Sequence, residues 1–283
     1  MGLKNKTPRS FFKTLFAAFG IVTLGVWILS SMSQADTNPG DIFQPDKKQV
    51  SIWAWDRFDD LSFLKDDTSV TSYAGTFYLR DNRSLFDPRK KELVCPKDTA
   101  RIPSFRIESV SKIDADYEDS AIAGICDTIK QYLRNHSDCQ KMVQIDFDAT
   151  ESERDFYKKL LVALRKTLKS NQNTSDTKIS ITALTSWCLK DKWMHNLDVD
   201  EIVIMLFSLG QDKEEILTEL KDTNLDTGNK ASTAIGISAN EPQTNEALKI
   251  LGIINDAQKV YIFQSLPWTE NRFVSITNEV IPQ

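Results

Sequence analysis

Met142-Val-Gln-Ile-Asp-Phe-Asp148 is a short apolar run, and a segment with a different periodicity follows it from Ser152 to Leu168. The first segment has the length and the Val and Ile content of a buried β-strand. In the second, five apolar residues fall on one helical stripe with charged residues opposite: Phe156, Leu160, Leu161, Leu164 and Leu168. The pair predicts a strand followed by an amphipathic helix that covers it.

The same alternation continues on both sides of this unit. Helical periodicity recurs at 120–133, 212–220 and 245–254. The other candidate strands are short apolar or β-branched runs at 50–56, 70–79, 102–108, 179–184, 202–209, 233–238 and 260–266. Alternating strands and helices imply parallel crossovers, and eight such units favour a closed barrel over an open doubly wound sheet. The fold class is therefore predicted as α/β, a (β/α)8 TIM-type barrel, with the segment from Tyr73 to Arg106 as the one stretch without a clear helix.

The N-terminus has the three parts of a secretory signal. A basic start is followed by an apolar run from Leu15 to Leu29 and by small residues from Ser30 to Ala35. The run is long for a cleaved signal peptide and short for a helix that spans a hydrocarbon core of ~30 Å. Cleavage after Ala35 and retention of residues 15–31 as an anchor helix in the inner membrane both remain open.

These features predict three regions. Residues 1–35 are a signal peptide or signal anchor, residues 36–48 are a polar linker with Pro39 and Gly40, and residues 49–283 are the barrel. In either case the barrel is exported, to the periplasm or the cell surface, because the basic flank stays in the cytoplasm. The membrane is a partner only through an uncleaved N-terminal segment.

Composition and charge exclude several classes of function. The chain has 283 residues, 41% of them apolar, and a net charge of −5, which argues against a nucleic-acid-binding surface. The sequence contains neither of the glycine-rich phosphate-binding motifs G-x-G-x-x-G and G-x-x-x-x-G-K-[ST], so a nucleotide cofactor is not expected. The two histidines, His136 and His195, have no ligand spacing, and no metal or other cofactor is predicted.

Four cysteines, Cys95, Cys126, Cys139 and Cys188, follow the leader and would be exported with the barrel. Disulfides persist in such compartments, and no paired C-x-x-C spacing indicates zinc. Two disulfides or free buried thiols are both expected alternatives. The pairing of Cys126 with Cys139 would close a short loop and is the first to test.

Reactive side chains of a parallel barrel gather at the carboxyl ends of its strands. Gln144, Asp146 and Asp148 are spaced by two, so they are expected on one side of a strand. Two neighbouring carboxyl groups raise the proton affinity of at least one of them, which can supply an acid. Asp146 and Asp148 are therefore the candidate catalytic residues. The alternative is that Asp146 forms a structural ion pair with Arg106 or Arg57 and that Asp148 caps the next helix.

Other strand ends supply candidates for substrate binding. Indole rings stack on sugar faces, and several tryptophans lie at or just after strand ends, although core packing is the usual role of any single one. The predicted binding residues are Trp55, Asp56, Arg106, Glu108, Trp187, Asn240, Glu241 and Trp268.

Four blocks of this sequence resemble the bacterial domain-of-unknown-function family numbered 3142. They are Val50-Ser-Ile-Trp-Ala-Trp-Asp-Arg57, Val143-Gln-Ile-Asp-Phe-Asp-Ala149, Ser180-Ile-Thr-Ala-Leu-Thr-Ser-Trp-Cys188 and Val199-Asp-Glu-Ile-Val-Ile-Met-Leu-Phe207. The resemblance implies a barrel similar to glycoside hydrolases, with no settled activity.

The Asp146-Phe-Asp148 block also looks like the end of the chitinase-type motif, in which a catalytic glutamate follows two residues later. Thr150 occupies that position here and Glu151 comes one residue late. One residue reverses the direction of a side chain in a strand, so the chitinase mechanism is not supported.

Two functional hypotheses follow. The first is an exported carbohydrate-active protein that hydrolyses glycosides with the carboxylate pair at the strand end. The alternative is a non-catalytic glycan-binding or envelope assembly module on the same barrel. Both expect a polysaccharide or another glycan as partner and no nucleic acid.

Overall fold

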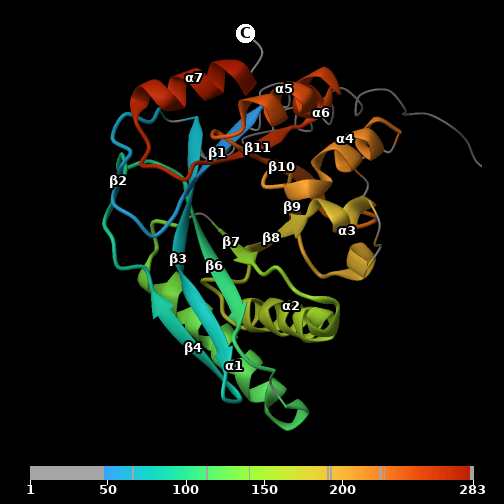
Figure 1. Ribbon diagram of the computed structural model, residues 1–283. Helices are drawn as coiled ribbons and strands as arrows, with labels where there is room; N and C mark the ends of the chain where they lie inside the picture. Colours follow the sequence, from blue (N-terminus) through green and yellow to red (C-terminus); the bar gives the residue numbers. More distant parts are fainter. Residues whose placement is uncertain are drawn as a thin grey trace, which may run out of the picture. The chain divides into compact units, whose positions relative to one another are not determined.

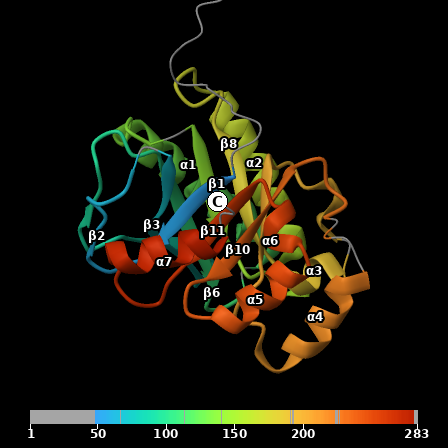
Figure 2. The ribbon, with the colours of Figure 1, turned by 90° about the horizontal axis from the view of Figure 1, so that it is seen from above.

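Eight parallel strands form a closed ring in the computed structural model, which describes residues 48–65, 67–112, 114–139, 141–189, 191, 193–222, 225 and 227–280. β11 pairs with β1, so the ring closes between the ends of this part of the chain (Figure 1, Figure 2). Around the ring the strands are β1 (Gln49–Ala54), β3 (Thr68–Arg80), β6 (Arg101–Ser109), β7 (Met142–Asp146), β8 (Lys178–Leu184), β9 (Glu201–Met205), β10 (Ser232–Ser238) and β11 (Lys259–Phe263). The predicted TIM-type barrel is confirmed, together with all eight predicted strands.

Among the described residues, helices follow six of the eight strands and lie around the barrel (Figure 2). They are α1 (Ala115–Asn135), α2 (Arg154–Lys169), α3 (Thr185–Leu189), α4 (Lys213–Asp222), α5 (Pro242–Ile250), α6 (Ile253–Asp256) and α7 (Glu270–Val280), with short 3-10 turns η1 (Glu151–Glu153), η2 (Trp193–Asn196) and η3 (Gly210–Asp212). The apolar stripe predicted between Ser152 and Leu168 is buried in α2. Burial of this stripe is what fixes the helix on the barrel.

The segment between β3 and β6, which lacks a helical pattern, forms a β-hairpin instead. The first half of β3, Thr68–Ser72, pairs with β1, and the second half, Gly75–Arg80, pairs with antiparallel β4 (Arg83–Pro88). Asp81 and Asn82 have φ of 52° and 59°, as the two central residues of a type I′ turn require. The hairpin extends past the carboxyl end of β1 and lies against α1, so it continues one wall of the barrel beyond the mouth (Figure 1). Two short strands, β2 (Asp59–Asp60) and β5 (Leu93–Val94), pair with each other outside the ring.

The structure shortens four of the predicted strands at their carboxyl ends. β7 ends at Asp146, and the backbone N–H of Ala149 bonds to the carbonyl of Phe147, which turns the chain toward η1. β1, β9 and β11 end at Ala54, Met205 and Phe263. Asp148 is therefore a loop residue, and the prediction that it extends the strand side with Gln144 and Asp146 is wrong.

A buried carboxylate stabilises the opposite end of the barrel interior. Glu201, 4% exposed, accepts hydrogen bonds from the Ser180 hydroxyl at 2.8 Å and from the Tyr261 hydroxyl at 2.5 Å. Its second oxygen pairs with the Lys259 ammonium at 2.9 Å. A buried charge with this many partners is tolerated because each oxygen is compensated. The network joins three strands, β8, β9 and β11.

Truncation at this point tests the network. Glu201→Ala leaves Lys259 without its carboxylate and removes the acceptor for two hydroxyl groups, so we expect a loss of about 3 to 5 kcal/mol in the free energy of unfolding. Urea denaturation measures this loss. Asp176→Asn, which removes the partner of Lys141 in an exposed pair, is the control and is expected to change stability far less. Equal effects of the two substitutions would contradict the role given to Glu201.

The predictions for the N-terminus concern residues outside the part of the chain that the structure describes, which begins at Lys48. This holds for the signal or anchor helix of residues 1–35 and for nearly all of the 36–48 linker. The described residues between Lys48 and Val280 form one compact structural unit. Within its described part, no helix combines the length and apolar character needed to cross a membrane.

None of the four cysteines forms a disulfide in the structure. Cys126 lies in α1 and its side chain is hydrogen-bonded to Thr167 of α2, with burial raising the pKa of the thiol to about 12. Cys139 instead lies beside Arg101 at the start of β6. The Cys126–Cys139 disulfide is therefore not formed, because Cys126 lies between α1 and α2 whereas Cys139 lies beside β6. The alternative of free thiols holds in this structure.

Candidate functional site

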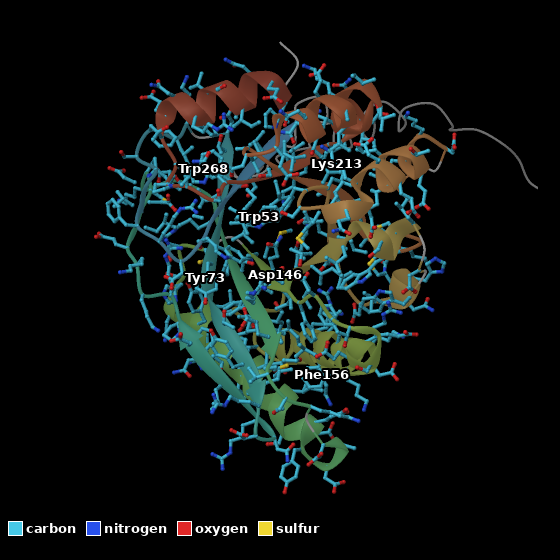
Figure 3. All side chains as sticks on the ribbon, in the orientation of Figure 1. Trp53, Tyr73, Asp146, Phe156, Lys213 and Trp268 are labelled. Atoms are coloured by element: carbon cyan, nitrogen blue, oxygen red, sulfur yellow. The ribbon has the colours of Figure 1, made fainter. Side chains whose placement is uncertain are left out.

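A cavity of about 540 Å³ lies among the carboxyl ends of the strands, the position where parallel barrels carry their sites. Its lining comes from strands β1, β6, β7, β8, β9 and β11, from the segments that follow β1, β7 and β9, and from helices α3 and α4. Figure 3 shows Asp146 below Trp53 in the barrel. The predicted location at the strand ends is thus occupied by a real cavity.

Aromatic and aliphatic side chains form one wall of the cavity. Phe207 and Phe263 are stacked, with ring centroids 5.5 Å apart and planes 10° apart, and Trp55 meets Phe263 edge-on at 6.5 Å. All three rings are partly exposed. Met205, Leu209 and Ile216 extend the same wall. The result is an apolar wall of partly exposed side chains, in which the Phe207 and Phe263 rings are parallel and the Trp55 ring is perpendicular to Phe263.

Trp53 lies beneath this wall and connects it to the polar interior. Its indole N–H donates to the Gln144 side-chain oxygen at 2.8 Å, and the Ser104 hydroxyl donates to the same oxygen at 3.2 Å. A Cβ on Gly236 would lie 2.8 Å from the Trp53 ring, so only glycine leaves room for the indole there. These contacts hold the floor of the cavity in one arrangement.

Charged groups form the opposite wall. Arg106 and Asp146 are direct neighbours on the adjacent strands β6 and β7. The guanidinium lies 3.1 Å from one Asp146 oxygen, and the Thr182 hydroxyl donates to the other at 2.7 Å. Arg106 also bonds to Glu108 at 2.8 Å. Asp146 is thus compensated at both oxygens.

Asp148 differs from Asp146 in having no such partners. Among the described residues, no side chain or backbone group donates a hydrogen bond to its carboxyl group, and none forms an ion pair with it. Asp148 is exposed at the cavity, yet the protein around it removes part of its hydration. This desolvation, with the nearby Asp146 charge, raises the pKa of Asp148, and Arg106 partly opposes the rise. A carboxyl group of this kind keeps its proton to a higher pH than an ordinary aspartate.

The structural alternative for the aspartates is half correct. Asp146 forms the ion pair with Arg106, whereas Arg57 pairs with Asp59. Asp148 does not cap the next helix. That role belongs to Thr150, whose backbone N–H and hydroxyl both bond to Glu153 at 2.7 Å in a capping box. The position that a chitinase-type motif gives to glutamate is therefore occupied by a helix-capping threonine.

Of the predicted binding residues, Trp55 and Arg106 line the cavity, and Glu108 is joined to it through Arg106. Trp187 and Trp268 do not line it, so their predicted role in the cleft is wrong. Trp187 is 4% exposed and packs against Trp193. Trp268 is 4% exposed and donates its indole N–H to the Trp53 carbonyl, between the barrel and α7 (Figure 3). For both indoles, core packing outweighs the signal of a strand-end position.

Three predicted polar residues also lie outside the cavity lining. Asp56 accepts hydrogen bonds from the backbone N–H groups of Lys90 and Lys91. Asn240 accepts two, from the backbone N–H and the hydroxyl of Ser265. Glu241 accepts one from the backbone of Ser208, a cavity residue with φ of 54°. Strained backbone persists where neighbours hold it. Glu241 therefore positions the cavity rim without contributing to the lining.

Several residues of the site could not be recognised from the sequence. Phe207 and Phe263 were inside predicted strands, where an aromatic residue is normally attributed to the core. Thr182 and Gln144 were on predicted strands without an assigned role. Asp212 lines the cavity from η3, and its only signal in sequence is a position shortly after a strand. Groups of three or more potential metal ligands are absent from the described residues.

Comparisons with known proteins give a likeness in fold. No family model matches the chain, and no curated protein matches it. A chitinase of glycoside hydrolase family 18 from Pseudoalteromonas aurantia is 10% identical, with a TM-score of 0.48 over 82% of this chain and 99% of the other. The catalytic domain of a family 18 chitinase from the fern Peteris ryukyuensis is 12% identical, with a TM-score of 0.49 over 77% and 92%.

A mutant class V chitinase from Nicotiana tobaccum, solved in complex with NAG4, is 10% identical, with a TM-score of 0.42 over 68% of this chain and 67% of the other. At TM-scores and identities this low, the likeness carries no argument about function. The class that the structure itself defines is a TIM-type barrel with a cavity at the carboxyl ends of its strands.

The environment of Asp148 predicts a cost in stability. Because the pKa of Asp148 is raised in the folded state, the folded chain binds this proton more tightly than the unfolded chain does. Ionisation of Asp148 therefore disfavours folding. That cost is complete above the folded pKa and vanishes below the ordinary value. We expect Asp148→Asn to raise the melting temperature at neutral pH, with the gain shrinking as pH falls.

Thermal unfolding across a pH series measures this effect. Asp119→Asn, at an exposed position on α1, is the control for loss of one acidic charge. A lower melting temperature for Asp148→Asn at neutral pH would show that the carboxylate is stabilised rather than strained by its surroundings.

Proposed function

We propose that this chain is an exported carbohydrate-active protein that binds a glycan in the strand-end cavity and hydrolyses a glycosidic bond with Asp148 as general acid. The observation that carries the proposal is the environment of Asp148, a carboxyl group with a raised pKa and no protein partner at the edge of an aromatic cavity. Membership in family 3142 and export are parts of the same proposal and rest on the sequence alone.

The aromatic wall supports a sugar as ligand. Pyranose rings have an apolar face that stacks on flat aromatic groups, and Trp55, Phe207 and Phe263 offer partly exposed rings. The cavity volume of about 540 Å³ lies in the range of small-molecule sites. Polar groups on the facing wall, Arg106 and Thr182 among them, would meet the hydroxyl groups of the same sugar.

The charged wall of the cavity, with Asp146 and the nearby Asp148, supports acid catalysis. A general acid must carry its proton near the working pH, and desolvation together with the Asp146 charge favours this form of Asp148. Asp146, fixed by Arg106 and Thr182, is a positioning residue that also raises the proton affinity of Asp148. Its negative charge would stabilise an oxocarbenium-like transition state in the cavity.

A second candidate is a non-catalytic glycan-binding or envelope assembly module. Asp146 favours it, because a carboxylate bound by both Arg106 and Thr182 is not free to act as nucleophile or base. Thr150 favours it too. This threonine caps η1 through its bond to Glu153, and it occupies the position where a chitinase-type motif has a catalytic carboxyl group. This candidate predicts glycan binding without products.

A glycan-binding screen on the purified chain, followed by product analysis for each ligand found, separates the two candidates. For the hydrolase, Asp148→Asn should lower kcat by about 10² to 10⁴ fold, the range for removal of a general acid, with little change in glycan affinity. Asp119→Asn serves again as the charge-matched control and should keep full turnover. Glycan binding with no hydrolysis in the unsubstituted protein would establish the second candidate, and turnover retained in Asp148→Asn would remove Asp148 from the mechanism.

A further inference from the structure

The charges that line the cavity do not balance. Among the described lining residues, Arg106 is the only basic side chain, whereas three acidic side chains, Asp146, Asp148 and Asp212, line the same space. Arg106 is already shared between Asp146 and Glu108. The Arg106 charge is therefore neutralised by these two carboxylates. The net charge of the cavity lining remains negative even when Asp148 carries a proton.

Of these three acidic residues, Asp212 is the one that has no role in the proposed hydrolysis. It ends η3 in the loop between β9 and α4, so it enters the cavity from a different loop than Asp148, with β8 between the two parent strands. Among the described residues, no hydrogen bond or ion pair involves its carboxyl group. Lys213 follows directly in the chain but does not line the cavity. The carboxylate thus lies at the cavity without a cation of the protein's own.

Asp212 also lies on the aromatic side of the cavity. Phe207 and Leu209 precede it in the same loop, and Ile216 follows it on α4, and all three line the cavity. A cation held there would be close to aromatic faces, which attract positive charge in addition to the carboxylate. A neutral sugar would gain only the stacking contacts and hydrogen bonds.

We infer that the cavity selects a glycan with free amino groups, whose ammonium group binds Asp212 while the sugar ring stacks on Phe207 and Phe263. This inference rests on the proposed function and narrows its substrate class to polysaccharides that contain hexosamine units without N-acetyl groups. An acetylated amine would leave Asp212 desolvated and without a cationic partner, which disfavours the acetylated form.

A structural role for Asp212 is the competing explanation. Acidic residues near a helix N-terminus stabilise the helix, and Asp212 directly precedes α4. Glu214 and Glu215 already lie in the first turn of that helix. A purely structural Asp212 would change the melting temperature and would leave the preference between amino and N-acetyl sugars unchanged.

The test compares two probes of equal length, glucosamine oligosaccharides and N-acetylglucosamine oligosaccharides. Titration calorimetry on the full chain, at a mildly acidic pH where the amines are charged, should give an affinity about two- to fivefold higher for the amino form, the effect of one ion pair with an exposed carboxylate. Added salt should reduce this preference. Asp212→Asn should remove most of it, whereas Asp222→Asn, an exposed residue at the far end of the same helix, should not. A polyamine without a sugar ring should bind much more weakly than the amino oligosaccharide.

Each outcome decides the matter. Equal or tighter binding of the N-acetyl form, a preference that survives Asp212→Asn, or polyamine binding as tight as that of the amino sugar would overturn the inference. If the N-acetyl form binds and the amino form has no advantage, the proposed function still stands. If the chain binds no glycan in the screen and neither probe here, the proposed function fails together with the inference.

Discussion

The ion pair between Arg106 and Asp146 is the interaction on which the site depends. The parallel register of β6 and β7 places the two residues side by side at the mouth of the barrel, and Thr182 from β8 completes the contacts. A carboxylate buried to this extent requires a compensating partner. Because Asp146 takes the single basic group of the described lining, the Asp148 charge two residues later is left without compensation. Desolvation of Asp148 at the cavity, together with the neighbouring Asp146 charge, therefore raises its pKa, and Arg106 opposes the rise only in part.

Fold and site are connected through the departures from the regular barrel repeat. The hairpin of β3 and β4 replaces a helix and extends one wall past the strand ends, while Glu241 holds the strained backbone of Ser208 at the rim. Inside the barrel, the Trp53 indole bonds to Gln144 beneath the mouth, and Glu201 of β9 bonds to groups of β8 and β11 lower down. These buried polar groups thus have hydrogen-bond partners within the barrel. Among the described residues, the carboxyl groups of Asp148 and Asp212 at the cavity have none.

The barrel could be predicted because strand and helix periodicities are local. Several strands have a continuous apolar run, as Ile202 to Ile204 illustrate, which is expected of a sheet buried on both faces. Asp146 and Arg106 could be identified because ionisable groups in such runs are rare. The tryptophan roles could not, since Trp187 and Trp268 have the same strand-end positions as Trp55 and differ only in their three-dimensional neighbours. Asp212 could not be found either, because a charged residue at a helix start has no distinctive pattern.

The central claim is that Asp148 is an acid whose proton affinity is raised by its place in the cavity. Carboxyl-carbon NMR titration of the folded protein, with Asp148→Asn to assign the signal, measures this property at the residue itself. The account predicts that Asp148 titrates above the ordinary range of an aspartate. It also predicts that the midpoint moves down when Asp146→Asn removes the neighbouring charge. An Asp148 signal that titrates at or below the ordinary aspartate value would contradict the account.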